Sequence, residues 1–190
     1  MKKRILVLLL VLSILCALTG CDGNDESVTP KEYGEFYTED GIMQNTKITI
    51  TIDNEDLTVP IPIKELSYTL YEKCDFSLKV VDYAGGNECR DLIEVYQDGV
   101  WMEAPRCGNG GLSVSGYVIL GGDYAEYDTF QRKMSFHDKE EAHYLCYMPL
   151  QPGQYRLRVK YAVEAADENV EIPKGQLEAV AYFTVTAPVE

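Results

Sequence analysis

The chain has 190 residues, with 17 basic and 31 acidic side chains and a formal net charge of −14 at pH 7. A surface this negative is repelled by phosphate backbones, which argues against nucleic acid as a partner. The length is sufficient for one domain with a hydrophobic core.

The N-terminal segment "MKKRILVLLLVLSILCALTGC" is typical of an export signal. Basic residues 2–4 precede an apolar run over 5–18 that is too short to cross a bilayer comfortably. The tetrapeptide "LTGC" at 18–21 resembles the lipobox of bacterial lipoproteins. This resemblance implies that residues 1–20 are a signal peptide and that Cys21 carries an acyl anchor, which places the chain at the cell membrane and outside the cytoplasm. Processing leaves 14 basic against 31 acidic residues, a net charge of −17.

The segment 21–46 is predicted to be an acidic flexible tether. Its sequence "DGNDESVTPKEYGEFYTEDGIMQN" holds seven acidic residues against one lysine and no sustained apolar period. Such a composition buries too little apolar surface to fold alone. We expect the folded domain to begin near Lys47 and to span 47–188.

From Lys47 onward, apolar and polar residues alternate with period two, and turn residues recur at the spacing typical of a sandwich or barrel. Pro60 and Pro62 indicate an edge or a connection. The runs that predict strands are "KITITID", "CDFSLKV", "LSVSGYVIL", "YLCYM", "QYRLRVKYAV" and "LEAVAYFTV". Only "DKEEAH" and "AADENVE" suggest a helical turn, so the expected fold class is all-β.

The stretch "DLIEVYQDGVWMEAP" predicts a β-hairpin around Asp98-Gly99 and holds the only tryptophan, Trp101. A two-residue turn would pair Gln97 with Val100. A type I turn with a bulge at Gly99 would pair Tyr96 with Val100 instead.

We favour the bulged register, because it also places Cys89 opposite Cys107 at a non-hydrogen-bonded pair, where side chains approach most closely. Trp101 would then lie opposite Val95 and face the core. Asp91 and Glu103 would share that face and lie at its rim.

Six cysteines fall to four once Cys16 leaves with the signal and Cys21 is lipidated. An exported domain favours disulfides over free thiols. If Cys89 pairs with Cys107, elimination pairs Cys74 with Cys146. No CxxC spacing occurs, so a zinc site is not expected.

Two motifs together resemble the bacterial immunoglobulin-like domain of Gram-positive lipoproteins: "DLIEVYQDGVWMEAP" and, later, "LQPGQYRLRVKY". The resemblance implies an immunoglobulin-like β-sandwich of about seven to nine antiparallel strands. In the second motif, Pro152 and Gly153 would turn the chain. Tyr155 could then return its hydroxyl to nearby backbone, as in the tyrosine corner of such sandwiches.

No pattern predicts catalysis or a cofactor. His137 lies in "HDKEEAH", which lacks the spacing of a zinc-binding helix. Asp123 and Asp128 belong to an acidic loop that could offer oxygen ligands to calcium but has no calcium-loop spacing. We therefore interpret these three metal candidates as a solvated charged surface.

The expected function is a non-enzymatic, membrane-anchored binding or interaction module with an unknown protein or glycan partner. Fourteen tyrosines are compatible with such a surface. Loops 106–114, 121–142 and 165–176 are the predicted binding regions. The alternative is an accessory or inhibitory lipoprotein that acts on an envelope enzyme.

Overall fold

The structure, a computed structural model, describes residues 31–54, 57, 63–83, 91–108, 116–121, 129–139, 146–165 and 170–187. Glu32–Glu190 form one structural unit. Every regular element in the described residues is a β-strand, and no helix occurs among them. The predicted all-β class is therefore confirmed.

The described residues form thirteen strands, more than the resemblance implied. They are β1 (Phe36–Glu39), β2 (Ile42–Asn45), β3 (Ile48–Ile52), β4 (Glu65–Glu72), β5 (Ser77–Tyr83), β6 (Asp91–Gln97), β7 (Val100–Glu103), β8 (Arg106–Cys107), β9 (Gly116–Leu120), β10 (Thr129–Ser135), β11 (Cys146–Tyr147), β12 (Gly153–Ala165) and β13 (Leu177–Val185).

The largest sheet has eight strands and is organised around β12. Along its main path the order is β1-β2-β13-β12-β5-β9, while β6 pairs with β12 and with β7. The long strand β12 pairs with β6 through its first half and with β5 through its second half. The pairings are antiparallel except between β2 and β13, which meet in parallel at Met43 and Leu177. The sheet is thus mixed, whereas the sequence predicted antiparallel strands throughout.

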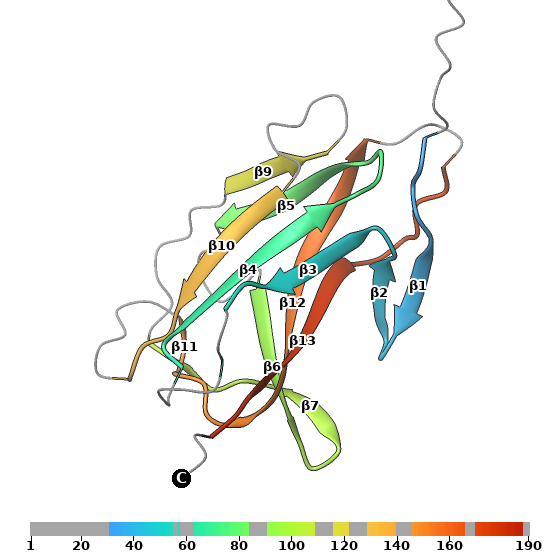
Figure 1. Cartoon of the computed structure of the whole chain (residues 1–190). Coiled ribbons are helices and arrows are strands. Elements are labelled where there is room, and N and C mark those ends of the chain that lie inside the picture. The colour runs from blue at the N-terminus through green and yellow to red at the C-terminus, as the bar shows by residue number, and fades with distance from the viewer. Residues whose placement is uncertain are drawn as a thin grey trace, which may run out of the picture. The chain divides into compact units, whose positions relative to one another are not determined.

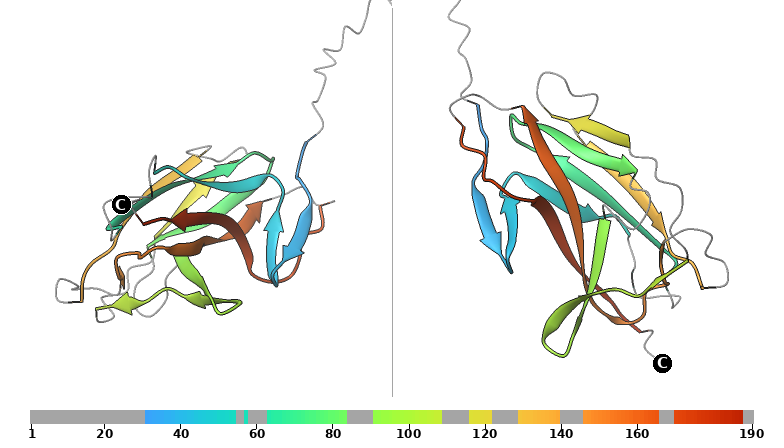
Figure 2. Two further views of the ribbon diagram at one scale, coloured as in Figure 1. Left: turned by 60° about the horizontal axis from the view of Figure 1, so that its bottom comes forward. Right: turned by 180° about the vertical axis from the view of Figure 1, so that it is seen from behind.

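A second sheet, of order β10-β4-β3, lies against the large one (Figures 1 and 2). The core fills the space between them, because alternate residues of each strand point inward. The strand β4 contributes Leu66, Tyr68 and Leu70, and β12 contributes Leu157 and Val159. All five side chains are fully buried. A short sheet of β11 and β8 completes the fold.

Asp91 links the two sheets from within the core. Its carboxylate accepts a hydrogen bond of 3.0 Å from the Tyr68 hydroxyl and lies 3.2 Å from Nε of Arg132. Asp91 is only 4% exposed. The prediction that it lies at a rim is wrong, because the first residue of β6 points toward the second sheet.

The ordered chain begins earlier than the sequence indicated. Residues 36–45, which lie in the predicted tether, form the β1–β2 hairpin. Its turn residues, Asp40 and Gly41, have positive φ angles of 50° and 77°. Positive φ at both central residues is the requirement of a type I′ turn, for which Asp-Gly is a preferred pair.

Aromatic contacts hold the N-terminal segment onto the unit. The ring centroids of Tyr33 and Phe36 lie 4.9 and 5.8 Å from that of Phe76. The backbone N–H of Asp75 also donates to the carbonyl of Glu32 over 2.9 Å. The chain is therefore packed against the core from about Glu32 onward.

Candidate functional site

The outer face of the large sheet, which points away from the second sheet, carries the candidate site. Strand alternation sends Val95 into the core and leaves Tyr96 outside. Pairing then places Trp101 opposite Tyr96, and Tyr182 opposite Arg156 of β12. Side chains from β6, β7, β12 and β13 therefore meet on one surface.

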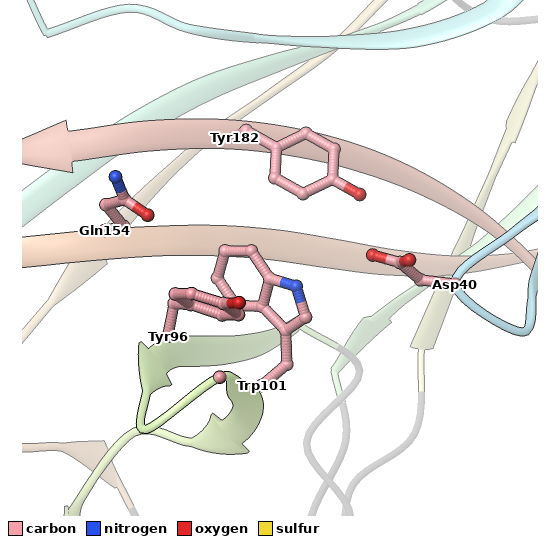
Figure 3. Close-up of a pocket in the computed structure, with 6 residues that line it drawn as sticks. Asp40, Tyr96, Trp101, Gln154 and Tyr182 are labelled. Carbon is pink, nitrogen blue, oxygen red and sulfur yellow. The ribbon is translucent and has the colours of Figure 1, made fainter.

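Three rings form what we call the aromatic patch: Tyr96, Trp101 and Tyr182 (Figure 3). The Trp101 centroid lies 5.0 Å from that of Tyr96 and 5.7 Å from that of Tyr182, with interplanar angles of 52° and 56°. Tyr96 is 43% exposed and Tyr182 is 49% exposed. The three rings thus form tilted walls that remain open to solvent.

The patch lines a surface depression of about 460 Å³. The carboxylate of Asp40 and the amide of Gln154 stand on opposite sides of the rings (Figure 3). Figure 3 shows the Tyr182 hydroxyl pointing toward the side where Asp40 lies. The lining residues are Asp40, Tyr96, Gly99, Trp101, Gln154 and Tyr182.

Both hairpin turns contribute to this depression. Asp40 is the first turn residue of the β1–β2 hairpin, and Gly99 is the second turn residue of the β6–β7 hairpin. Asp98 and Gly99 have φ angles of 52° and 86°, so this turn also has positive φ at both central positions. Two Asp-Gly turns, far apart in the sequence, therefore border one site.

A buried guanidinium supports the patch. The Arg156 guanidinium carbon lies 4.7 Å from the centroid of the Trp101 ring, and Arg156 is only 4% exposed. Arg156 also donates to Glu94 over 2.5 Å and to Asp40 over 3.2 Å. Because Arg156 is buried while Trp101 is half-buried, the guanidinium covers the inner side of the indole and fixes its position.

The charges continue along β12 as an ion cluster of Arg156, Arg158, Glu94 and Glu178. Arg158 donates to both oxygens of Glu178, over 2.6 and 3.0 Å, and to Glu94 over 3.1 Å. Burial opposes the charged form of Arg158, but Glu178 and Glu94 outweigh it and raise the pKa of the guanidinium. With Asp40, the two cations face three carboxylates.

The predicted hairpin is present, but its favoured register is wrong. Gln97 pairs with Val100, so the turn has two residues and no bulge. Trp101 consequently faces Tyr96 on the outer surface and not Val95 in the core. The type I′ turn is preferred here because its twist matches that of the strands, and aspartate tolerates the positive φ at its first position.

The hydrogen bond predicted for the tyrosine corner is present. The Tyr155 hydroxyl donates to the backbone carbonyl of Gln151 over 2.8 Å. Pro152 lies in the bend before β12, and Gly153 is the first residue of that strand. The Tyr155 ring is buried and stacks on Phe183 at a centroid distance of 5.5 Å. These residues belong to the scaffold on the inner face, beneath the site.

The cysteines are arranged differently from the predicted pairing. Cys107 and Cys146 are directly opposed in the β8–β11 sheet, and their sulfurs lie 3.5 Å apart. Cys74 follows the C-terminal end of β4. The strand β11 lies near the N-terminal end of β4, because the backbone N–H of Phe136 donates to the carbonyl of Lys64 and that of His137 donates to the carbonyl of Tyr147 in β11. The eight residues of β4 separate these two ends by about 26 Å. A disulfide requires the two Cα atoms to lie within about 7 Å of each other.

The predicted bridge between Cys74 and Cys146 is therefore wrong. Cys74 is buried, and burial together with Glu72 raises the pKa of its thiol well above the ordinary range. Cys89 and Cys21, the predicted lipidation site, lie outside the described residues.

Of the three metal candidates, His137 alone lies in the part of the chain that the structure describes. His137 is exposed, and its backbone carbonyl accepts a hydrogen bond from Cys107. No group of three or more metal-ligating side chains occurs among the described residues. Asp123 and Asp128 lie outside them. Large parts of the three predicted binding loops also lie outside, while the patch is built mainly on strands and tight turns.

Sequence reasoning missed Asp40, Arg156, Gln154 and Tyr182 as site residues. Two signals for them were present in the sequence. The pair Asp40-Gly41 is the same hairpin signal that was recognised at Asp98-Gly99. In β12, Arg156 and Arg158 alternate with buried apolar residues, so both arginines lie on the outer face of the sheet. Their positive charges there indicate that carboxylates from neighbouring strands lie beside them.

Comparison with known proteins adds little. No family model matches the chain, and no curated protein matches it. The solved structure of AvmM, which "Catalyzes Macrocyclization in Alchivemycin A Biosynthesis", is similar at 10% identity over 83% of this chain and 98% of that chain, with a TM-score of 0.30. A likeness at this TM-score carries no argument about fold or activity. Among the described residues, no helix is long and apolar enough to span a membrane.

Proposed function

We propose that this chain is a membrane-anchored extracytoplasmic lipoprotein whose β-domain is an immunoglobulin-like binding module. The aromatic patch is its binding surface. The lipobox at 18–21 supports the anchor. Two facing sheets and the Tyr155 corner support the immunoglobulin-like assignment.

The observation that carries the binding role is the exposure of clustered rings in one depression. Tyr96 and Tyr182 keep 43% and 49% of their surface exposed, although both touch Trp101. Apolar area that stays in contact with water does not stabilise the fold. Exposed aromatic surface with a polar rim is a usual mark of a recognition site.

The patch is also preorganised. The Arg156 guanidinium packs against the inner side of the Trp101 ring and forms an ion pair with Asp40. Arg156 is in turn fixed by Glu94, which also binds Arg158. A surface whose side chains are already ordered loses less conformational entropy when a ligand binds.

The chemistry of the depression favours binding over catalysis. Its six lining residues include one carboxylate, Asp40, which is ion-paired with Arg156. None of the six is a histidine, cysteine, serine or lysine. Asp40, which could act as a nucleophile or a base, is held by Arg156, and the usual Ser–His, Cys–His or lysine nucleophile does not occur among these described residues.

Retention of envelope components by the full chain tests the proposal. The protein is immobilised in a detergent without a sugar headgroup and exposed to envelope extracts and wall glycans of the producing cell. The variant Tyr182→Ala removes an exposed ring of the patch, and Tyr71→Ala is the matched control on the second sheet. We expect Tyr182→Ala to lose the retained component and Tyr71→Ala to keep it.

Equal retention by Tyr182→Ala and Tyr71→Ala would contradict the patch as the binding surface. If the retained component were an envelope enzyme with reduced activity, the accessory or inhibitory role would be favoured instead. The anchor is tested separately with Cys21→Ser. We expect this variant to leave the membrane fraction, and its continued membrane association would contradict lipid anchoring at this residue.

A further inference from the structure

We infer that the aromatic patch binds a neutral pyranose ring of a glycan, an assignment that rests on the proposed function. A pyranose presents an apolar C–H face and an edge of hydroxyl groups. The depression offers the complement of both, with three rings at its centre and polar side chains around them (Figure 3).

The rings provide the stacking surface. Trp101 stands between Tyr96 and Tyr182, with centroid distances of 5.0 and 5.7 Å. The buried Arg156 occupies its inner side, so the indole cannot turn inward to escape a ligand. Aromatic side chains supply large contact area at a low cost in conformational entropy, which suits weakly apolar ligands.

The rim provides directional hydrogen bonds. Asp40 offers a carboxylate acceptor held in place by Arg156, and Gln154 offers both a donor and an acceptor. The hydroxyls of Tyr96 and Tyr182 can donate or accept. Few polar groups around an aromatic centre is the usual composition of a small-molecule site. Alternating donors and acceptors match the hydroxyls of a sugar.

The charges select a neutral ligand. Arg156 and Arg158 are both ion-paired with carboxylates, so the site offers an anionic glycan no unpaired cation among its described residues. The chain as a whole is strongly negative, at −14. An organic cation is disfavoured for a different reason, because Arg156 already places a positive charge against the Trp101 ring.

The single tryptophan makes the test direct. Because the chain has one tryptophan, emission excited at the red edge of its absorption reports on the patch alone. The full chain, in a detergent without a sugar headgroup, is titrated with neutral oligosaccharides of glucose, mannose and N-acetylglucosamine. A polyuronate and choline serve as the anionic and cationic probes.

We expect a saturable change in Trp101 emission with at least one neutral oligosaccharide and none with the polyuronate or choline. Tyr182→Ala should weaken this binding by about tenfold, whereas Tyr71→Ala should leave it unchanged. Asp40→Asn keeps the turn, because asparagine also tolerates positive φ, and should weaken binding by removing the carboxylate acceptor.

The outcomes separate this inference from the proposed function. No response to any neutral sugar would overturn the sugar assignment, and a response to choline alone would replace it with cation recognition. If an envelope component is nevertheless retained in a Tyr182-dependent manner, the binding function stands without the sugar. Sugar binding that is unchanged in both Tyr182→Ala and Asp40→Asn would overturn the patch as the sugar site.

Discussion

The guanidinium carbon of Arg156 lies 4.7 Å from the centroid of the Trp101 ring, while the same guanidinium binds Glu94 and Asp40. One buried side chain thus joins the exposed patch to the ion cluster beneath it. Arg156 is 4% exposed and Glu94 is 8% exposed. A partner removed from such a pair leaves the other charge in a poorly solvated place.

We therefore expect Arg156→Met to lower the free energy of unfolding by about 3 to 5 kcal/mol, because Glu94 loses its closest cation. Urea denaturation measures the change. The double variant Arg156→Met with Glu94→Leu should recover part of the loss, since an apolar pair carries no desolvation cost and Arg158 keeps Glu178. A double variant less stable than Arg156→Met would speak against this account.

The Tyr155 hydroxyl donates to the carbonyl of Gln151 over 2.8 Å, so its removal should be unfavourable. Tyr155→Phe keeps the ring stacked on Phe183 and should lower the free energy of unfolding by about 1 kcal/mol. Equilibrium unfolding in urea measures the difference. An unchanged or raised stability would show that the corner hydrogen bond does not contribute.

Tyr161, on the same inner face of β12, should respond in the opposite direction. Its hydroxyl is buried and has no hydrogen-bond partner among the described residues. Tyr161→Phe removes this unsatisfied group and should raise the free energy of unfolding by about 1 kcal/mol at neutral pH. It serves as the matched counterpart of Tyr155→Phe, and destabilisation by Tyr161→Phe would contradict the assignment.

The same tyrosine predicts a pH dependence. Burial, with smaller contributions from Cys74 and Tyr37, raises the pKa of Tyr161 above its ordinary value of 10.0. The folded state therefore holds this proton more tightly than the unfolded state, and stability falls as the pH rises above about 10. The advantage of Tyr161→Phe over the wild type should grow in that range, and unfolding measured at pH 8 and pH 11 tests it.

Cys107 and Cys146 should form a disulfide in the exported protein, since their sulfurs lie 3.5 Å apart in directly opposed strands. Non-reducing peptide mapping should recover these two cysteines linked. Closing this loop should contribute about 4 kcal/mol in the chain-entropy model, which Cys107→Ser would remove. Recovery of Cys89 linked to Cys107 would restore the pairing favoured from the sequence.

Period-two alternation was a sufficient signal for several strands. The run "LEAVAYFTV" coincides with β13, and "QYRLRVKYAV" falls within β12. The strands β4 and β10 were not predicted, although "ELSYTLYE" also alternates its buried residues Leu66, Tyr68 and Leu70. Tyrosine and threonine between the leucines made this pattern less evident than an aliphatic one.

The register of the β6–β7 hairpin depended on a choice that local sequence leaves open. Asp98-Gly99 fits both a two-residue turn and a bulged one. The positions of Cys89 and Cys107 favoured the bulged turn, but Gln97 pairs with Val100, and the backbone N–H of Ala104 donates to the carbonyl of Ile93 in the same two-residue-turn register. The two-residue turn shifts every pair of the hairpin by one position, which removes the basis of that argument and, with it, the prediction that Trp101 faces the core.

The candidate site could not be predicted from the sequence because it depends on contacts between distant segments. Asp40 and Arg156 are 116 positions apart. No local period reveals that a turn near the N-terminus reaches the outer face of β12. The pairing of β2 with β13 helps to bring them together.

The attachment of Tyr33 and Phe36 to Phe76 also has a mechanical consequence. If the protein is tethered to a membrane through its N-terminal segment, a pulling force enters the domain near Glu32 and Tyr33, just before the β1–β2 hairpin. The hydrogen bond between Glu32 and Asp75 and the contact of Tyr33 with Phe76 would bear the load first. The contact of Phe36 with Phe76 would follow at the start of β1, before Asp40 at the far end of that strand. Recognition at the patch would then be insulated from tension in the anchor, as long as Phe76 keeps its two aromatic neighbours.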